Sequence, residues 1–460
     1  MKMDIASDPL ALQSAAYRDG AGRGAAYLDG LSARKVAATT TQLRSLDRPL
    51  PDTGMSADAV LALMDEVGAP GSVATAAGRY FGYVVGGALP AASGARAMLS
   101  AWDQIADRPT GPSVLVMEEV ALRWVADLLG LPGGTEGVFT TGATMANLAL
   151  LATARDELLA RAGWPRGRGL IGAPSLRIVA GAEIHATVLK SLRLAGLGSE
   201  AIERVPVDDQ GRMVVDALPR LDVRTLVLAQ AGNVCTGASD PFAPLVAACR
   251  EAGAWLHVDG AFGLWGRAAP ATAHGLVGVE GADSWVVDAH KWLNVPYDSG
   301  IALTRHPEAM RATMAMGASY LPPTAPSPAD LAPEFSRAAR GAECWAALLS
   351  LGREGVADLV ARCHGHACHI ADGLREMGFI LPHRVWLNQV FAIPPKGGRT
   401  GAEIAAAVQA SGEAWFGPAS WQGQDGFRIS VSNWATTERD VERLLLAVKA
   451  AALASARHQR

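Results

Sequence analysis

The sequence predicts an α/β protein built on a mostly parallel, doubly wound sheet. Short apolar runs recur through the middle of the chain, and stretches with helical spacing separate most of them. This alternation of strand and helix is typical of a parallel sheet. Polar residues follow several of the runs at their carboxyl ends, which is where ligands bind in such a sheet.

Each apolar run is expected to form one short buried strand. The expected strands span residues 137–140, 176–180, 225–229, 255–258, 284–287 and 301–304. Helices are expected at 118–129, which ends at Gly130, and at 145–160, which follows a glycine turn.

The pattern divides the chain into three parts. Residues 1–82 read as an N-terminal helical segment without its own large core, expected to pack on a second subunit. Residues 83–346 form the large α/β domain, which includes a Pro-, Ala- and Ser-rich stretch from 317 to 335, expected to be a long loop that acts as a lid or is disordered. Residues 347–460 begin with a long helix and end with a strand at 427–432 and a final helix, as in a small α+β domain.

Composition limits the function classes. The 460 residues carry a net charge of −4 without a long charged run, so we expect no nucleic-acid partner and no anionic membrane surface. No segment is apolar over the roughly 18 residues that a membrane span needs, and the polar N-terminus does not resemble a signal peptide. Five scattered cysteines favour the reducing cytoplasm.

Two of the runs end in residues of complementary chemistry. The run 255–258 leads into Asp259, and the run 284–287 leads into Asp288-Ala289-His290-Lys291. An aspartate and a lysine on consecutive strand ends suit pyridoxal 5′-phosphate (PLP): the amine forms a Schiff base, and the carboxylate keeps the pyridine nitrogen protonated. A lone lysine after a strand would more simply be a solvated surface residue.

Two further motifs allow a structural and a functional interpretation. The turn 140–144 lies between a strand and a helix, where it is either an ordinary helix cap or a phosphate-binding turn that uses free N–H groups and the Thr144 hydroxyl. His185 begins a helix, and it is either a capping or core histidine or an imidazole stacked on the PLP ring beside the substrate carboxylate.

The run from Cys363 to His369 does not form a metal site. Cys363 belongs to an apolar helical stripe, and His364 with Cys368 would supply only half of a zinc site. The motifs of P-loop nucleotide hydrolysis, of α/β-hydrolases and of NAD binding are absent from the sequence.

In order and spacing, these motifs resemble group II PLP-dependent decarboxylases, a family that includes aromatic-L-amino-acid and glutamate decarboxylases. The segments 81–83, 336–340 and 427–433 match as well, so that the resemblance covers roughly residues 45–450. It implies fold type I of PLP enzymes with a mostly parallel seven-stranded sheet, amino-acid metabolism, and an obligate homodimer with shared active sites.

The resemblance also implies roles for single residues. Lys291 would form the Schiff base, Asp259 would bind the pyridine nitrogen, and His185 would stack over the ring; these three are the expected catalytic residues. The other expected cofactor contacts are Ala261 under the ring and Ala143, Thr144 and His290 at the phosphate. The expected substrate contacts are Tyr83, Val84, Val85, Gln104 of the partner subunit and, as a substrate-binding or structural cation, Arg428.

The implied activity is decarboxylation of an L-amino acid, aromatic or related, to the amine and CO₂ through an external aldimine. Aromatic decarboxylases of this family use a tyrosine on a mobile loop, whereas residues 322–334 here contain no tyrosine. Oxidative deamination to an aldehyde, aminotransfer and aldol-type cleavage therefore stay open as other reactions of the same scaffold. A non-catalytic PLP-binding protein is a further alternative, which the complete set of lysine, aspartate and histidine disfavours.

Overall fold

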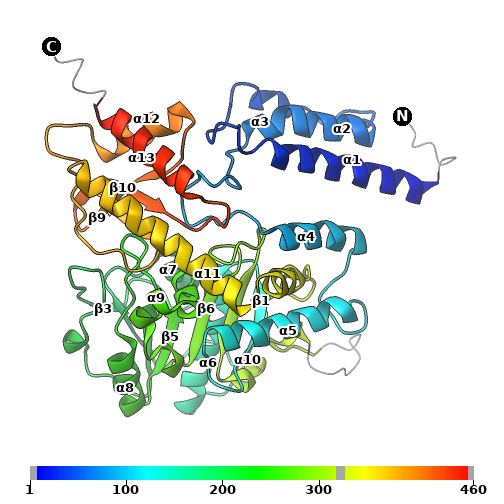
Figure 1. Cartoon of the computed structure of the whole chain (residues 1–460). Helices are drawn as coiled ribbons and strands as arrows, with labels where there is room; N and C mark the ends of the chain where they lie inside the picture. Colours follow the sequence, from blue (N-terminus) through cyan, green and yellow to red (C-terminus); the bar gives the residue numbers. More distant parts are fainter. Residues whose placement is uncertain (1–7, 318–326, 454–460) are drawn as a thin grey trace.

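The large sheet has seven strands and is covered by helices, with a smaller sheet beside it (Figure 1). The computed structural model describes residues 8–317 and 327–453. The strands of the large sheet are β1 Glu136–Thr140, β2 Arg177–Gly181, β3 Ile202–Val205, β4 Thr225–Gln230, β5 Trp255–Asp259, β6 Ser284–Asp288 and β7 Gly300–Thr304.

The strand order is β1-β7-β6-β5-β4-β2-β3. The strands β3, β2, β4, β5 and β6 run parallel to one another, whereas β7 is antiparallel to both of its neighbours. The prediction of a mostly parallel seven-stranded sheet is therefore confirmed. All residues of β4, β5, β6 and β7 are buried, because helices cover both faces of the sheet.

The helices of this part are α4 Pro90–Trp102, α5 Pro112–Leu128, α6 Ala143–Arg161, α7 Ala186–Leu194, α8 Phe242–Ala252, α9 Pro270–Ala273 and α10 Pro307–Met314. The helix expected at 118–129 begins earlier, at Pro112, because proline suits the first helical position. The helix expected at 145–160 begins two residues earlier, so that Ala143 and Thr144 lie in its first turn.

The C-terminal part is built around α11 Arg340–Glu376, which is interrupted by non-helical backbone at Gly352. It continues with β8 Gln389–Ala392, α12 Gly401–Ser411, β9 Gly417–Trp421, β10 Gln424–Ser430 and α13 Glu438–Leu453, and its antiparallel sheet has the order β8-β10-β9. The helix that was expected to open the small domain at 347 thus begins within the large one. Its apolar stripe is buried and includes Cys363, as the sequence predicts.

The N-terminal arm comprises α1 Pro9–Asp29, α2 Ala57–Leu63, a π-helical turn Met64–Gly68 and α3 Ala69–Gly71. It extends beyond the body at the upper right of Figure 1. None of the residues of α1, all of which are described, is buried within this chain.

Two predictions concern loops and membranes. Within the expected loop 317–335, residues 318–326 lie outside the described residues, and the rest contains a 3₁₀ turn, Pro328–Asp330, which is capped by Ser327. No helix in the described ranges is long and apolar enough to cross a membrane.

Candidate active site

Lys291 lies in the turn after β6, beside a carboxylate to which the sequence analysis gave no role. Its Nζ is 3.2 Å from Oδ2 of Asp288, the last residue of β6. Asp288 is buried, and its Oδ1 has no hydrogen-bond partner among the residues that the structure describes. The spacing of three residues between Asp288 and Lys291 is the sequence signal for this ion pair.

Asp259 ends β5, the strand next to β6. Its Oδ1 accepts a hydrogen bond from the backbone N–H of Ala261 at 3.1 Å, and its Oδ2 faces Nδ2 of Asn147 at 3.5 Å. The carbonyl of Ala261 in turn accepts from the N–H of Asp288 at 2.8 Å. The two strand ends that carry Asp259 and Lys291 are therefore fixed to each other, as expected for neighbouring parallel strands.

The turn before α6 is formed by close backbone contacts. Gly142 is the N-cap of α6, and within the described part of the chain no acceptor is found for the N–H groups of Ala143 and Thr144. A Cβ on Gly142 would lie 3.1 Å from Cε1 of His290, and a Cβ on Gly300 of β7 would lie 2.3 Å from Cα of Gly142. The turn thus presents two free N–H groups at a helix N-terminus, beside an imidazole.

His290 is held in one tautomer. Its Nδ1 accepts from the backbone N–H of Ser299 at 3.0 Å, so the neutral ring carries its hydrogen on Nε2, which lies 3.5 Å from Oδ2 of Asp288. Burial lowers the pKa of His290, and the charge of Asp288 partly opposes that shift. The ring of Tyr297 stacks on this imidazole with centroids 4.3 Å apart, a contact that the sequence did not indicate.

His185 has the capping role that the sequence allowed, and its stacking on a cofactor ring stays a prediction. It is the N-cap of α7, and its Nδ1 accepts from the N–H of Thr187 at 3.3 Å and contacts the Thr187 hydroxyl at 2.7 Å. Burial lowers the pKa of His185, while the nearby charges of Asp259 and Lys291 act in opposite directions on it. The helix cap therefore also places this imidazole at the two strand ends.

The segment that contains Tyr83 lies against the lysine turn. A Cβ on Gly86 would come within 2.1 Å of the carbonyl oxygen of Lys291. Tyr83 and Val84 both have positive φ angles, 53° and 59°, which is rare for a β-branched residue such as valine. This backbone buries Val84, leaves Val85 half-buried and leaves Tyr83 66% exposed.

The exposed ring of Tyr83 belongs to an aromatic group with Tyr80 and Trp415. Ring centroids of Tyr80 and Tyr83 lie 5.0 and 5.5 Å from that of Trp415. Arg428 lies near both tyrosines and donates to the carbonyl of Val234 at 2.9 Å, and burial lowers its pKa. Gln104 donates instead to the carbonyl of Trp102 in its own chain, so that within one subunit nothing links it to this site.

The residues at the two strand ends and the α6 turn fit PLP. The α6 turn offers free N–H groups for a phosphate, at a place where a side chain would fill the space. Asp259 receives only N–H donors from the protein and keeps lone pairs for a pyridinium N–H. Lys291 would supply the amine. Among the described residues, two buried polar atoms at this place have no hydrogen-bond partner: Oδ1 of Asp288 and the hydroxyl of Ser299.

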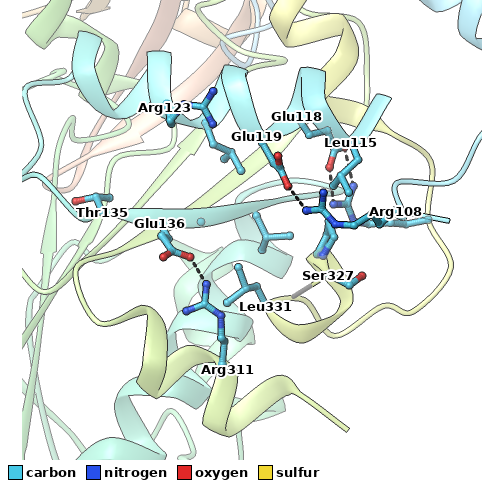
Figure 2. Close-up of a pocket in the computed structure, with 15 residues that line it drawn as sticks. Arg108, Leu115, Glu118, Glu119, Arg123, Thr135, Glu136, Arg311, Ser327 and Leu331 are labelled. Carbon is cyan, nitrogen blue, oxygen red and sulfur yellow. Dashed lines mark hydrogen bonds and ion pairs between the residues drawn. The ribbon is translucent and has the colours of Figure 1, made fainter. Parts of the chain in front are cut away.

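A separate hollow of about 420 Å³ lies between α5, β1 and α10 (Figure 2). Ion pairs between Arg108 and Glu119 and between Arg311 and Glu136 border it. None of the candidate site residues lines it, so we do not assign the chemistry to this hollow.

Comparison with known proteins agrees with this site. Residues 45–390 match the family model of the pyridoxal-dependent decarboxylase conserved domain. The chain is 30% identical over 213 residues to the aromatic-L-amino-acid decarboxylase of Bacillus atrophaeus, which is 45% of this chain and 42% of that protein. It is 27% identical over 376 residues to the acidic amino acid decarboxylase GADL1 of Mus musculus, which is 77% of this chain and 67% of that protein.

Solved structures establish the fold. The crystal structure of Oryza sativa TDC with PLP and tryptamine superposes with a TM-score of 0.87 at 21% identity, over 97% of this chain and 99% of that one. The crystal structure of mouse CSAD gives 0.88 at 22% identity, with the same coverage of both chains. Both superpositions span nearly the whole of each chain and confirm the predicted fold type I.

The chain belongs to the family of pyridoxal-dependent decarboxylases. This membership confirms the family resemblance and PLP as the cofactor. Among the described residues there is no cluster of His, Cys, Asp and Glu that could hold a metal ion. The roles of the single site residues, and the substrate, are not decided by family membership.

Proposed function

We propose that this chain is a carboxy-lyase that decarboxylates an L-amino acid to the amine and CO₂. The observation that carries this is the placement of Lys291 and Asp259 on adjoining strand ends, with His185 beside them. The first relatives support the reaction class, although the alignments cover 42% of the first relative's length and 67% of the second's.

When it is bound, PLP supplies the electron sink that allows the bond to the carboxylate to break. Lys291 would hold the cofactor through its amine. Asp259 would accept the pyridine N–H and so keep that nitrogen protonated. Ala143, Thr144 and His290 would hold the phosphate with N–H donors, and Ala261 would support the ring.

His185 is the group we place over the ring and next to the reacting carbon. Its Nδ1 is occupied by Thr187, so its Nε2 is the side that faces the substrate. Burial keeps the imidazole neutral, which suits contact with a carboxylate as it loses its charge as CO₂. The product amine needs one proton on Cα, and in this assignment Lys291 would supply it as the ammonium, because a neutral His185 ring has no acidic hydrogen to give.

We propose that the substrate is aromatic or related to aromatic amino acids. The aromatic group of Tyr80, Tyr83 and Trp415 supports this, because aromatic side chains pack favourably on such surfaces. Val84, Val85 and Arg428 complete the proposed pocket. Since the relatives also include cysteine sulfinic acid and acidic amino acid decarboxylases, L-glutamate and L-cysteine sulfinate are the comparison substrates.

A second candidate is oxidative deamination to an aldehyde, which uses the same residues. The observation that favours this reaction is the absence of tyrosine from residues 322–334. Product analysis separates the two reactions. Both release CO₂, but a decarboxylase gives a primary amine, whereas the alternative consumes O₂ and gives aldehyde, ammonia and peroxide.

We also propose that the chain has three structural parts, close to residues 1–82, 83–346 and 347–460.

We further propose a homodimer that places Gln104 of the partner subunit at the site. The supporting feature is a cleft of about 1130 Å³ between α1, α4 and the start of α13. The leucines that α1 leaves exposed, Leu10, Leu12 and Leu28, are not covered by any of the residues that the structure describes, and contact with a second subunit would bury them. All five cysteines are free, which supports a cytoplasmic location.

The experiment that tests the function is a comparison of wild type with Lys291→Ala. Wild type should show the visible absorbance of lysine-bound PLP and release CO₂ and amine from an aromatic L-amino acid. Lys291→Ala should lose the absorbance and the activity. The control is Lys190→Ala, which should keep the absorbance and the activity, because Lys190 lies on α7 and makes none of the proposed contacts. Absorbance in wild type with keto acid or aldehyde as the only product would move the reaction to another class.

A further inference from the structure

Behind Asp259 lies a line of buried polar side chains that the proposed mechanism does not use. Side chains alternate along a strand, so Trp255, His257 and Asp259 of β5 point to the same face of the sheet. Leu256 and Val258 point to the other face, where they join the main hydrophobic core.

Two neighbouring elements complete this line. Ser284 of β6 is the register partner of His257, and Asn147 comes from α6, which covers this face of β5 and β6. Both side chains are buried, as are Trp255 and His257. A strand, its neighbour and a helix therefore each contribute to one polar path that ends at Asp259.

Four contacts link the path. Trp255 Nε1 donates to Ser284 Oγ at 3.0 Å, and Ser284 Oγ is 2.8 Å from His257 Nδ1. His257 Nε2 is 2.7 Å from Asn147 Oδ1, and Asn147 Nδ2 is 3.5 Å from Asp259 Oδ2. The last contact is the longest, and it is the one that reaches the proposed cofactor ligand.

The tryptophan end sets the direction of the hydrogen bonds. An indole N–H can only donate, so the Ser284 oxygen accepts from Trp255. Within the described structure, the only acceptor for the Ser284 hydrogen is His257 Nδ1. Burial lowers the pKa of His257 to about 4, so the ring is neutral at neutral pH and carries its single hydrogen on Nε2.

The aspartate end requires the same direction. With its hydrogen on Nε2, His257 donates to Asn147 Oδ1, so the amide NH₂ group of Asn147 faces Asp259. The reverse arrangement would place the amide oxygen against the carboxylate and would leave the Ser284 hydrogen without an acceptor. Both would cost free energy in a buried site.

We infer that Trp255, Ser284, His257 and Asn147 are positioning residues that orient the Asp259 carboxylate for the pyridine nitrogen. Together with the N–H of Ala261 on Oδ1, this relay gives each carboxylate oxygen one protein donor and fixes the plane of the group. The inference rests on the proposed role of Asp259 as the ligand of PLP.

The test uses the PLP-loaded protein and a matched pair of variants. Ser284→Ala removes the hydroxyl from the relay, whereas Thr304→Val removes a buried hydroxyl from the directly opposite position of β7, where it contacts Asp283 and His306. Ser284→Ala should raise the PLP dissociation constant about tenfold, the scale of one buried hydrogen bond. Thr304→Val should change it by less than about threefold.

A second readout reports on the relay without any turnover. ¹⁵N NMR of the histidine rings, assigned by the signal that is lost in His257→Asn, should show wild-type His257 protonated at Nε2, and a mixture of tautomers in Ser284→Ala. Should Ser284→Ala not fold, Trp255→Phe removes only the indole donor and should cause the same mixture.

The outcomes separate this inference from the proposed function. Wild-type His257 protonated at Nδ1, or equal PLP dissociation constants for Ser284→Ala and Thr304→Val, would overturn the relay and leave the proposed function standing. Failure of the wild-type protein to bind PLP would overturn the proposed function itself.

Discussion

His257 makes stability depend on pH. The folded protein does not protonate this buried ring until about pH 4, whereas the unfolded chain takes up the proton near pH 6.5. Between these values the unfolded state binds more protons, so the free energy of unfolding falls as the pH drops from about 6.5 to 4. This residue alone should contribute a loss of about 3 kcal/mol.

The measurement is the free energy of unfolding by urea at several pH values in this window. His257→Gln should flatten the acid slope by that amount, and His274→Gln, which removes an exposed histidine, should leave the slope as it is. Equal slopes in wild type and His257→Gln would contradict the assignment.

Some site residues could be predicted from the sequence, and others could not. Asp259 and Lys291 were predicted because strand ends in a parallel sheet converge, and this rule needs no knowledge of side-chain contacts. Asn147 lies 112 residues before Asp259 and contacts it only because α6 packs on β5, so no pattern in the sequence indicates this contact. Asp288 was visible in the motif, but its contact with Lys291 depends on the turn that joins them.

At the scale of elements, a buried ion pair joins α5 to the segment before α11. Both oxygens of Glu118 accept from the Arg337 guanidinium, at 2.9 and 2.7 Å, and Glu118 Oε1 also accepts from the N–H of Gly341. The two side chains are 2% and 3% exposed, so removal of one partner leaves a buried charge unpaired.

Glu118→Ala should therefore lower the free energy of unfolding by about 3–5 kcal/mol. The next residue supplies the matched control, because Glu119 pairs with Arg108 at the surface and Glu119→Ala should cost less than about 1 kcal/mol. Denaturation by urea measures the free energy of unfolding of both variants. Similar losses of stability in the two would show that burial of the Glu118 pair does not contribute to stability.

Two of the strands that the sequence analysis missed lack a strong periodic signal. β3 is an edge strand that contains Glu203 and Arg204 and is only partly buried, so it has no apolar run. β9 has exposed and half-buried residues up to the buried Trp421 at its end, and it contains a proline. The central strands were predicted because burial on both faces requires continuous apolar residues.

At the scale of the molecule, the N-terminal arm is the part whose structure was hardest to predict from the sequence. The helix α1 was not predicted as a separate element, and none of its 21 residues is fully buried against the described part of the chain. A helix without a buried face is not stable by its propensity alone, so the arm points to contacts with a second copy.

A substitution on the arm tests the homodimer. Leu28→Asp places a charge on the exposed face of α1, where Leu28 is 53% exposed in the single chain, and should shift the protein from dimer to monomer in sedimentation experiments. Val223→Asp, at a residue of similar exposure (56%) in the loop before β4, should leave the dimer intact. A wild-type protein that sediments as a monomer would refute the proposed assembly.

The contact between Gly142 and Gly300 limits how this chain can diverge. β7 carries no proposed site residue, yet its first residue lies so close to the α6 turn that a Cβ would be 2.3 Å from Gly142 Cα. The α6 turn packs directly on the first residue of this antiparallel strand, so any side chain at position 300 would push the turn away from His290. A side chain at either of these two glycines can therefore be accommodated only if the strand and the turn are remodelled together.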